Sequence, residues 1–198
     1  MLGRRGVLLM ALMLAFVLVF ALGVQSAFAD VSGPWTYYDD GTGHAVIQIY
    51  DAGAPGGAVA IPDQLGGMDV VKLEYDYSTG GLGVFQDRTD ITSVTMPNTI
   101  TDLDHDNFYG CTGLTSVTLS TALTDTGYNT FYGCTSLATI ALPAGLTSVS
   151  GSAFQGCNAL ATVTIPAGVT VVADFAFNGC PLNQASMKLP AGLTTIGN

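Results

Sequence analysis

One period of 23 residues runs through most of this chain. Phenylalanine recurs once in each period, and in four of the five copies a Gly-Cys pair follows it closely. Self-similarity at a fixed spacing is the signature of a repeat protein, so one structural unit is expected several times over. The phenylalanines are Phe85, Phe108, Phe131, Phe154 and Phe177, and the cysteines are Cys111, Cys134, Cys157 and Cys180.

The same period predicts one short β-strand in each unit. In the segment Val117-Thr118-Leu119, apolar residues alternate with a hydroxyl residue, as in a strand with one buried face. Proline follows most of these strands, and because it has no amide hydrogen to donate, it fits the exit of a strand better than its interior. The residues at this exit position are Pro97, Ser120, Pro143 and Pro166.

A unit this small cannot bury its apolar face alone, so stacked units must share one core. The sequence therefore predicts a mainly β repeat solenoid over residues 59–198, in which each unit forms one coil. The last copy carries one additional residue after Cys180, which moves its strand to Met187 and Leu189. The sequence stops at Asn198 within a coil, so we expect the last coil to be truncated and the chain to be a fragment or a truncated product.

These units resemble those of the BspA-like leucine-rich-repeat proteins of bacterial surfaces. The resemblance covers roughly residues 59–198, and it implies a right-handed leucine-rich-repeat horseshoe or arc that serves adhesion to proteins of host or neighbouring cells. Fold alone does not assign a partner. The residues that carry the resemblance are well illustrated by one unit: Ala153, Phe154, Gln155, Gly156, Cys157, Leu160, Val163, Ile165, Pro166 and Val169.

Residues 30–58 are expected to form a hairpin that caps the N-terminal end of the repeats. Two β-type segments, residues 35–38 and 45–50, flank an Asp-Asp-Gly-Thr-Gly turn. The first repeat strand ends at Ile61 and Pro62, 35 residues before Pro97, so this unit carries a 12-residue insertion around residues 75–83. Such irregular units are typical of the ends of repeat arrays.

Residues 1–29 have the layout of a secretory signal peptide. Arg4 and Arg5 precede an unbroken apolar run, residues 7–22, and the small-residue pattern Ala-Phe-Ala ends at Ala29. The apolar run is long for a signal core, so an uncleaved membrane anchor is the alternative. The Ala-x-Ala pattern favours cleavage before Asp30, which predicts a secreted or cell-surface protein with no membrane insertion after cleavage.

The charge of the mature chain excludes several partners. Only Lys72, Arg88 and Lys188 remain after cleavage, against 15 acidic residues, so the formal net charge is −12. A surface of this sign gains nothing from the release of counterions by nucleic acid, and no basic patch reverses the sign locally. Anionic membrane surfaces are disfavoured for the same reason.

The four regularly spaced cysteines are expected to be buried free thiols. Zinc sites usually pair their ligands as Cys-x-x-Cys, whereas these cysteines lie one whole coil apart. Coils about 4.8 Å apart would allow a disulfide by distance, so that alternative stays open. Stacking in register points neighbouring Cβ atoms alongside each other rather than toward each other, which favours free thiols.

No metal, cofactor or catalytic centre is expected. Asp102, Asp104 and Asp106 superficially resemble the start of a calcium loop, but Asn107 and Gly113 stand where an EF-hand needs glycine and glutamate. The histidines, His44 and His105, lie in turns with no serine or cysteine elbow beside them. Glu74 is the only glutamate, and no carboxylate pair stands out.

The outward face of the predicted strands is the candidate binding site. Threonine suits exposed strands in any case, but repeat arrays commonly bind proteins through such an extended face. We therefore expect an extracellular protein or a cell-surface macromolecule to bind here. Ice binding by a flat hydroxyl array is the alternative, although Ala141 and Lys188 interrupt the array. The candidate residues are Ser93, Thr95, Ser116, Thr118, Thr139, Thr162 and Thr164.

Overall fold

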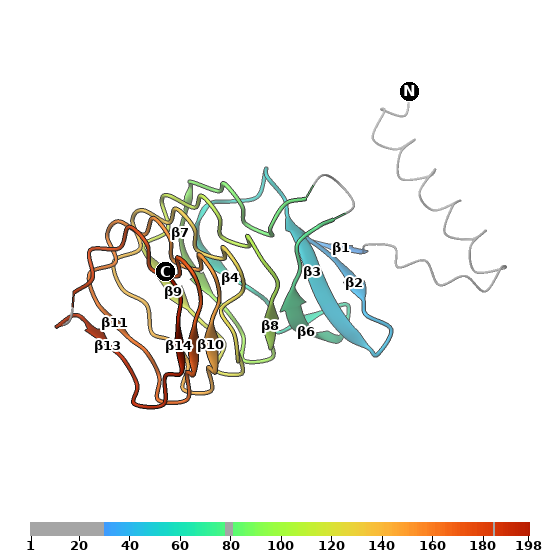
Figure 1. The fold of residues 1–198 in the computed structure, drawn as a ribbon. Coiled ribbons are helices and arrows are strands. Elements are labelled where there is room, and N and C mark those ends of the chain that lie inside the picture. Colours follow the sequence, from blue (N-terminus) through green and yellow to red (C-terminus); the bar gives the residue numbers. More distant parts are fainter. Residues whose placement is uncertain (1–29, 78–80, 184) are drawn as a thin grey trace, which may run out of the picture.

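The computed structural model describes residues 30–77, 81–183 and 185–198, and the expected signal peptide of residues 1–29 lies outside these ranges. The regular secondary structure of the described residues is all β-strand (Figure 1), as predicted, and none of them forms a helix that could span a bilayer. The strands are β1 (Asp30–Ser32), β2 (Trp35–Asp39), β3 (His44–Tyr50), β4 (Gly57–Ala60), β5 (Gln64–Leu65), β6 (Met68–Leu73), β7 (Ile91–Thr95), β8 (Asp102–Leu103), β9 (Ser116–Thr118), β10 (Ser148–Val149), β11 (Val163–Thr164), β12 (Val171–Val172), β13 (Met187–Lys188) and β14 (Thr195–Ile196).

The N-terminal strands form an antiparallel hairpin at the predicted place. Strand β2 pairs with β3, and β1 adds to the outer edge of β2. The connecting turn is held by Asp39, whose Oδ1 accepts hydrogen bonds from the amides of Gly41 and Gly43. On its other side β3 pairs in parallel with β6, which pairs with β8, so the hairpin continues directly into the repeats (Figure 1).

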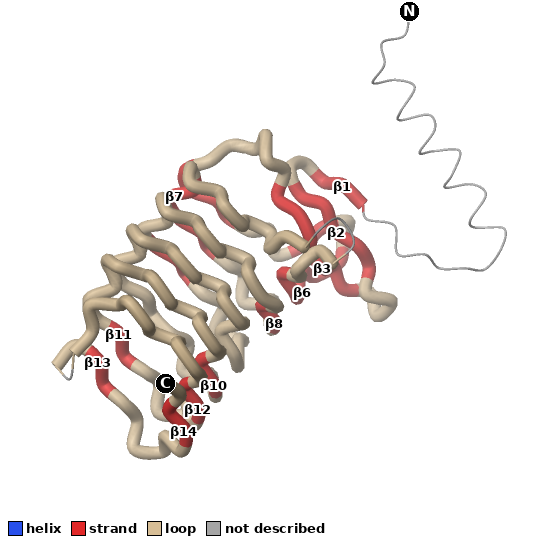
Figure 2. Tube along the Cα trace, turned by 45° about the horizontal axis from the view of Figure 1, so that its top comes forward, coloured by secondary structure: helices blue, strands red, loops and turns tan. Residues whose placement is uncertain are grey.

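The repeats stack through parallel pairs between strands one coil apart. Strands β4, β7 and β9 pair in order, and Val59, Val94 and Val117 occupy equivalent positions in them. Strands β11 and β13 continue this side of the coils, while β10, β12 and β14 form a second parallel set on another side (Figure 2). We call these two sides the first and the second ladder; β6 and β8 precede β10 in the second.

A column of stacked phenylalanines fills the centre of the coils. The rings of Phe85, Phe108, Phe131 and Phe154 are fully buried, and each ring lies 5.0–5.2 Å from the next at 10° or less. The column ends on Phe177, which is partly buried. Each phenylalanine side chain has the same environment as its neighbour one coil away, which explains why this residue type repeats with the period of the fold.

The cysteines line the core beside this column. Cys111, Cys134 and Cys157 are buried, as predicted, and each thiol donates a hydrogen bond of 2.9–3.2 Å to a phenylalanine carbonyl of the preceding coil. Cys180 makes the equivalent bond to Phe154 but is only partly buried, which corrects the expectation for this residue. A described coil packs against Cys180 on one side only, whereas the other three lie between two coils.

Candidate functional site

The predicted binding residues lie on the first ladder and share one outward face. Strand register places Ser93 beside Ser116 and Thr95 beside Thr118, and a single bridge joins Thr139 to Thr162. The intervening valines are buried, and alternation along a strand turns their neighbours outward. Ser93 is half-buried, and the other six of the seven predicted side chains are exposed. We call this surface the hydroxyl face.

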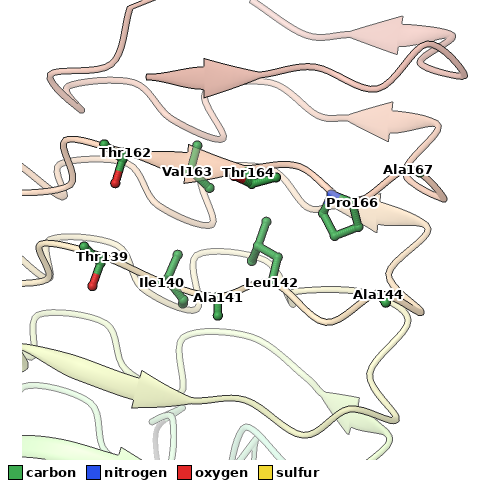
Figure 3. A pocket seen from close by; sticks show the side chains of 10 residues that line it. All are labelled: Thr139, Ile140, Ala141, Leu142, Ala144, Thr162, Val163, Thr164, Pro166 and Ala167. Atoms are coloured by element: carbon green, nitrogen blue, oxygen red, sulfur yellow. The ribbon is translucent and has the colours of Figure 1, made fainter. Parts of the chain in front are cut away.

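The hydroxyl face is hollowed at its centre. Residues 139–142 belong to no named strand, and a cavity of about 550 Å³ opens between them and the next coil (Figure 3). Ala141 borders it where the neighbouring coils carry Thr118 and Thr164, so little side-chain volume fills the space. Its lining residues are Thr139, Ile140, Ala141, Leu142, Ala144, Thr162, Val163, Thr164, Pro166 and Ala167.

Sequence reasoning did not find this hollow, because it lies between two coils and is lined by residues of both, so no single residue type marks it. From the sequence, Ala141 is expected only to interrupt the hydroxyl array. An ice-binding surface needs two straight rows of hydroxyl groups on a flat face. Here the hollow makes the face uneven, and Ala141 lacks a hydroxyl group. The hollow combines methyl groups with the hydroxyls of Thr139 and Thr162, a mixture that suits a protein surface.

The hydroxyl face carries little charge. Lys188 on β13 is the one ionisable side chain at the outward positions of β7, β9, β11 and β13. Binding at this face would therefore depend on shape, apolar contact and neutral hydrogen bonds. Long-range electrostatic attraction would contribute little there.

The acidic residues and histidines that were candidates for catalysis or metal binding contact neighbouring side chains. The ammonium group of Lys72 lies 3.3 Å from Glu74, 3.4 Å from Asp102 and 3.7 Å from Asp104. His105 contacts Asp106 at 2.9 Å, and His44 contacts Thr42 at 2.8 Å within its own turn. Within the described ranges, no group of three or more His, Cys, Asp or Glu side chains is placed to hold a metal ion.

Burial raises the pKa of the core thiols and makes them poor nucleophiles. It raises the pKa of Cys111 to about 12, and it also raises that of Cys134. A hydrogen bond with Cys180, followed by burial, raises the pKa of Cys157. Because the thiolate is the reactive form, these three cysteines are unsuited to nucleophilic catalysis.

Comparison with known proteins identifies the repeat. A family model for the BspA type leucine rich repeat region matches residues 81–198 in six copies. A search of curated proteins gives no match.

Several solved structures share the fold. A leucine-rich repeat protein of T. pallidum has 24% identity and a TM-score of 0.71, over 86% of this chain and 82% of the other. A leucine-rich repeat protein of Bacteroides ovatus has 27% identity and a TM-score of 0.72, over 85% of this chain and 43% of the other. A leucine rich cell surface protein of Faecalibacterium prausnitzii has 24% identity and a TM-score of 0.66, over 85% and 39%. The chain thus spans less than half of the last two proteins.

The family model covers more than half of the chain, and its repeats coincide with the stacked phenylalanine column and the parallel ladders. The protein therefore belongs to the BspA-type leucine-rich-repeat family.

Proposed function

We propose that this protein is secreted or held at the cell surface, where it binds an extracellular protein or another cell-surface macromolecule through the hydroxyl face, without catalysis. The observation that carries the proposal is the hollow between Thr139 and Thr162, set within an extended, nearly uncharged face. Proteins with leucine-rich repeats typically bind other proteins, and the structurally similar protein of Faecalibacterium prausnitzii is a leucine rich cell surface protein.

The proposal includes a division of the chain into a signal peptide of residues 1–29, a capping hairpin of residues 30–58 and a right-handed repeat solenoid from residue 59. Contacts at the start of the core support the capping role. Trp35 and Tyr50 place their rings 6.0 and 5.3 Å from that of Phe85, the first ring of the column. Both side chains are buried, which supports the proposal that the hairpin shields this end of the core from water.

Site-directed charge tests the binding face. Purified residues 30–198 would be presented to a panel of extracellular proteins by surface plasmon resonance, and a protein that binds would be retested with Ala141→Arg and Thr162→Arg. A charged side chain in the hollow must be desolvated on binding, so we expect at least about a tenfold loss of affinity. Val31→Arg, at an exposed position of β1, is the matched control. Equal binding by all variants would place the interface elsewhere.

Export is tested separately. Expression of the full chain in a bacterial host should release a protein that begins at Asp30, as read by N-terminal sequencing of the extracytoplasmic fraction. Replacement of Ala27 and Ala29 by bulky residues should leave the precursor uncleaved. A protein that keeps Met1 after export would contradict the signal-peptide assignment.

A further inference from the structure

Large exposed side chains gather along a turn that follows the second ladder. Eight large apolar side chains are exposed among the described residues, and four of them belong to this turn or to the insertion beside it: Tyr77, Leu82, Tyr128 and Phe175, at 69, 53, 55 and 47% exposure. We call Leu82, His105, Tyr128 and Phe175, together with Tyr75 and Tyr77, the aromatic ridge. Grouping of this kind marks an interaction surface, since scattered exposed apolar residues need no explanation.

The ridge runs across the coils in step with the repeat. Leu82, His105 and Tyr128 are each 23 residues apart, and a parallel bridge joins His105 to Tyr128. In the next coil the equivalent residue is Gly151, and a Cβ atom there would lie 3.0 Å from the Tyr128 ring. The Tyr128 ring thus lies against the glycine. One coil further on the equivalent residue is Asp174, and Phe175 follows it directly in the chain.

The rings at one end of the ridge hold each other in place. Tyr75 lies 4.0 Å from the His105 ring at 33°, and Tyr77 meets both rings edge-on. The Tyr77 hydroxyl and His105 Nε2 are 2.6 Å apart. The aromatic surface is therefore already ordered before a partner binds. Little side-chain conformational entropy would be lost on binding.

Carboxylates flank the ridge along the second ladder. They are Glu74, Asp102, Asp104, Asp106, Asp125 and Asp174, and the cation described among them is Lys72, which already contacts three of them. Asp106 contacts His105, and Asp125 accepts hydrogen bonds from Ser148 and Ser150. This side of the molecule is strongly negative, in contrast to the hydroxyl face.

We propose that the aromatic ridge docks an extended, arginine-rich segment of another extracellular protein. Guanidinium groups stack on aromatic faces and pair with carboxylates, so one side chain can use both features of this surface. Four coils at about 4.8 Å separate Leu82 from Phe175, a span that about six extended residues cover. The ridge and the hydroxyl face lie on different ladders, so binding at the ridge does not depend on binding at the hydroxyl face. The extracellular location of the partner rests on the export proposed above.

Peptides of equal length and equal magnitude of charge test the chemistry. Fluorescein-labelled peptides of about eight residues, alternating serine with arginine, lysine or glutamate, would be titrated with residues 30–198 and followed by anisotropy. We expect the arginine peptide to bind at least about threefold more tightly than the lysine peptide, and the glutamate peptide not to bind. Equal affinity for the arginine and lysine peptides would overturn the stacking component, and the absence of binding would overturn the proposal.

Variants locate the binding site. Tyr128→Ser should weaken the arginine peptide at least about fivefold and remove its advantage over lysine, whereas Tyr128→Phe should retain both. Leu189→Ser, which removes an exposed apolar side chain next to β13 on the first ladder, should change neither. Asp106→Asn should weaken both basic peptides more than Asp63→Asn, which makes the same charge change elsewhere. Equal losses in the two aspartate variants would mean that the peptides sense only net charge.

A variant of Phe175 distinguishes an effect on binding from an effect on folding. Its φ of 58° lies in the left-handed region, which disfavours a bulky side chain, and the equivalent residues of two earlier coils are Asp106 and Asn129. Phe175→Asn should therefore raise the melting temperature by a few degrees while it weakens the arginine peptide. A more stable variant with unchanged binding would remove Phe175 from the site.

Discussion

Single residues in the core show why the period is so strictly kept. Phe131 contacts an equivalent ring on each side, with centroids 5.2 Å away in both directions, and it is fully buried. Outside the core, Tyr109 and Tyr132 stack at 4.7 Å in the same way but are only half-buried. Ring stacking between equivalent positions thus occurs both in the core and at the surface. The extent of burial decides how much each stacked pair contributes to stability.

Phe131→Ala should lower the free energy of unfolding by about 3–5 kcal/mol, because it leaves a cavity between two rings that cannot both close it. Tyr132→Ala, the partly exposed control, should cost about 1.5 kcal/mol or less. Urea denaturation of residues 30–198 measures both. A loss below about 1 kcal/mol for Phe131→Ala would contradict its central place in the core.

The core thiols predict a loss of stability at high pH. Burial raises the pKa of Cys111 from 9.0 to about 12, so folding favours the protonated thiol. This contribution is fully present below pH 9 and is lost as the pH rises toward 12, where the thiolate must form in the core or the chain must unfold. Denaturation curves at pH 8, 10 and 11.5 should therefore show falling stability.

Cys111→Ala is the control for this pH dependence. The variant is expected to be less stable at pH 8 but to have a shallower slope above pH 9, because one titrating group is gone. The Tyr38 hydroxyl keeps titrating in both proteins, since burial and its hydrogen bond to Glu74 raise its pKa to about 12. An unchanged slope would mean that Cys111 does not contribute.

At the scale of elements, glycines set how closely the coils approach at the turns. Gly127 has a φ of 74°, and a Cβ atom there would collide with the carbonyl oxygens of Leu103 and Asp104 in the preceding coil. At Gly145 a Cβ atom would find its nearest neighbours at 3.7 Å, an ordinary contact. A side chain is therefore excluded at Gly127 by the neighbouring backbone, whereas at Gly145 there is room for one.

Gly127→Ala should destabilise the protein by about 2–4 kcal/mol, because it combines an unfavourable φ with a clash against backbone atoms. Gly145→Ala should be neutral or stabilising by up to about 1 kcal/mol, because it restricts the unfolded chain without strain. Thermal denaturation of the two variants side by side measures the difference. Similar stabilities would refute the proposed close approach at Gly127.

At the scale of the whole molecule, each coil depends on its neighbours. Val94 and Val117 lie in strands that pair within the array, whereas Val31 in β1 and Ile196 in β14 are 66 and 62% exposed. Nearest-neighbour stacking makes the stability of one coil a property of the coils beside it. Stability should therefore be highest in the middle of the described array.

Hydrogen exchange on residues 30–198 should be slowest over residues 91–165 and faster toward β1 and β14. The Phe131→Ala variant should lose protection in the coils on both sides of residue 131 and not only at the substituted turn. Uniform protection in the native protein, or a strictly local loss in the variant, would contradict the coupling between coils.

Much of the architecture was readable from the chain itself. The positions of Phe131, Cys134 and Leu137 recur because equivalent coil positions have equivalent surroundings, so a period in the sequence becomes a period in space. The same logic placed the strand residues around Val117 with their hydroxyl neighbours outward. Two β-type segments on either side of the turn at residues 39–43 predicted the hairpin. These features depend on local pattern and on repetition, both of which a single sequence contains.

Other features depend on contacts between coils, which no single repeat encodes. The hollow beside Ala141 is lined by residues of two coils, and the partial exposure of Cys180 depends on which coils cover it. The aromatic ridge arises because Tyr77, from an irregular insertion, meets His105, and because Gly151 leaves room beside Tyr128. The repeat by itself determined the coil, its core and the outward hydroxyl residues. The hollow and the aromatic ridge were decided only by tertiary stacking, because residues that depart from the repeat have no equivalent in other coils from which their position could be predicted.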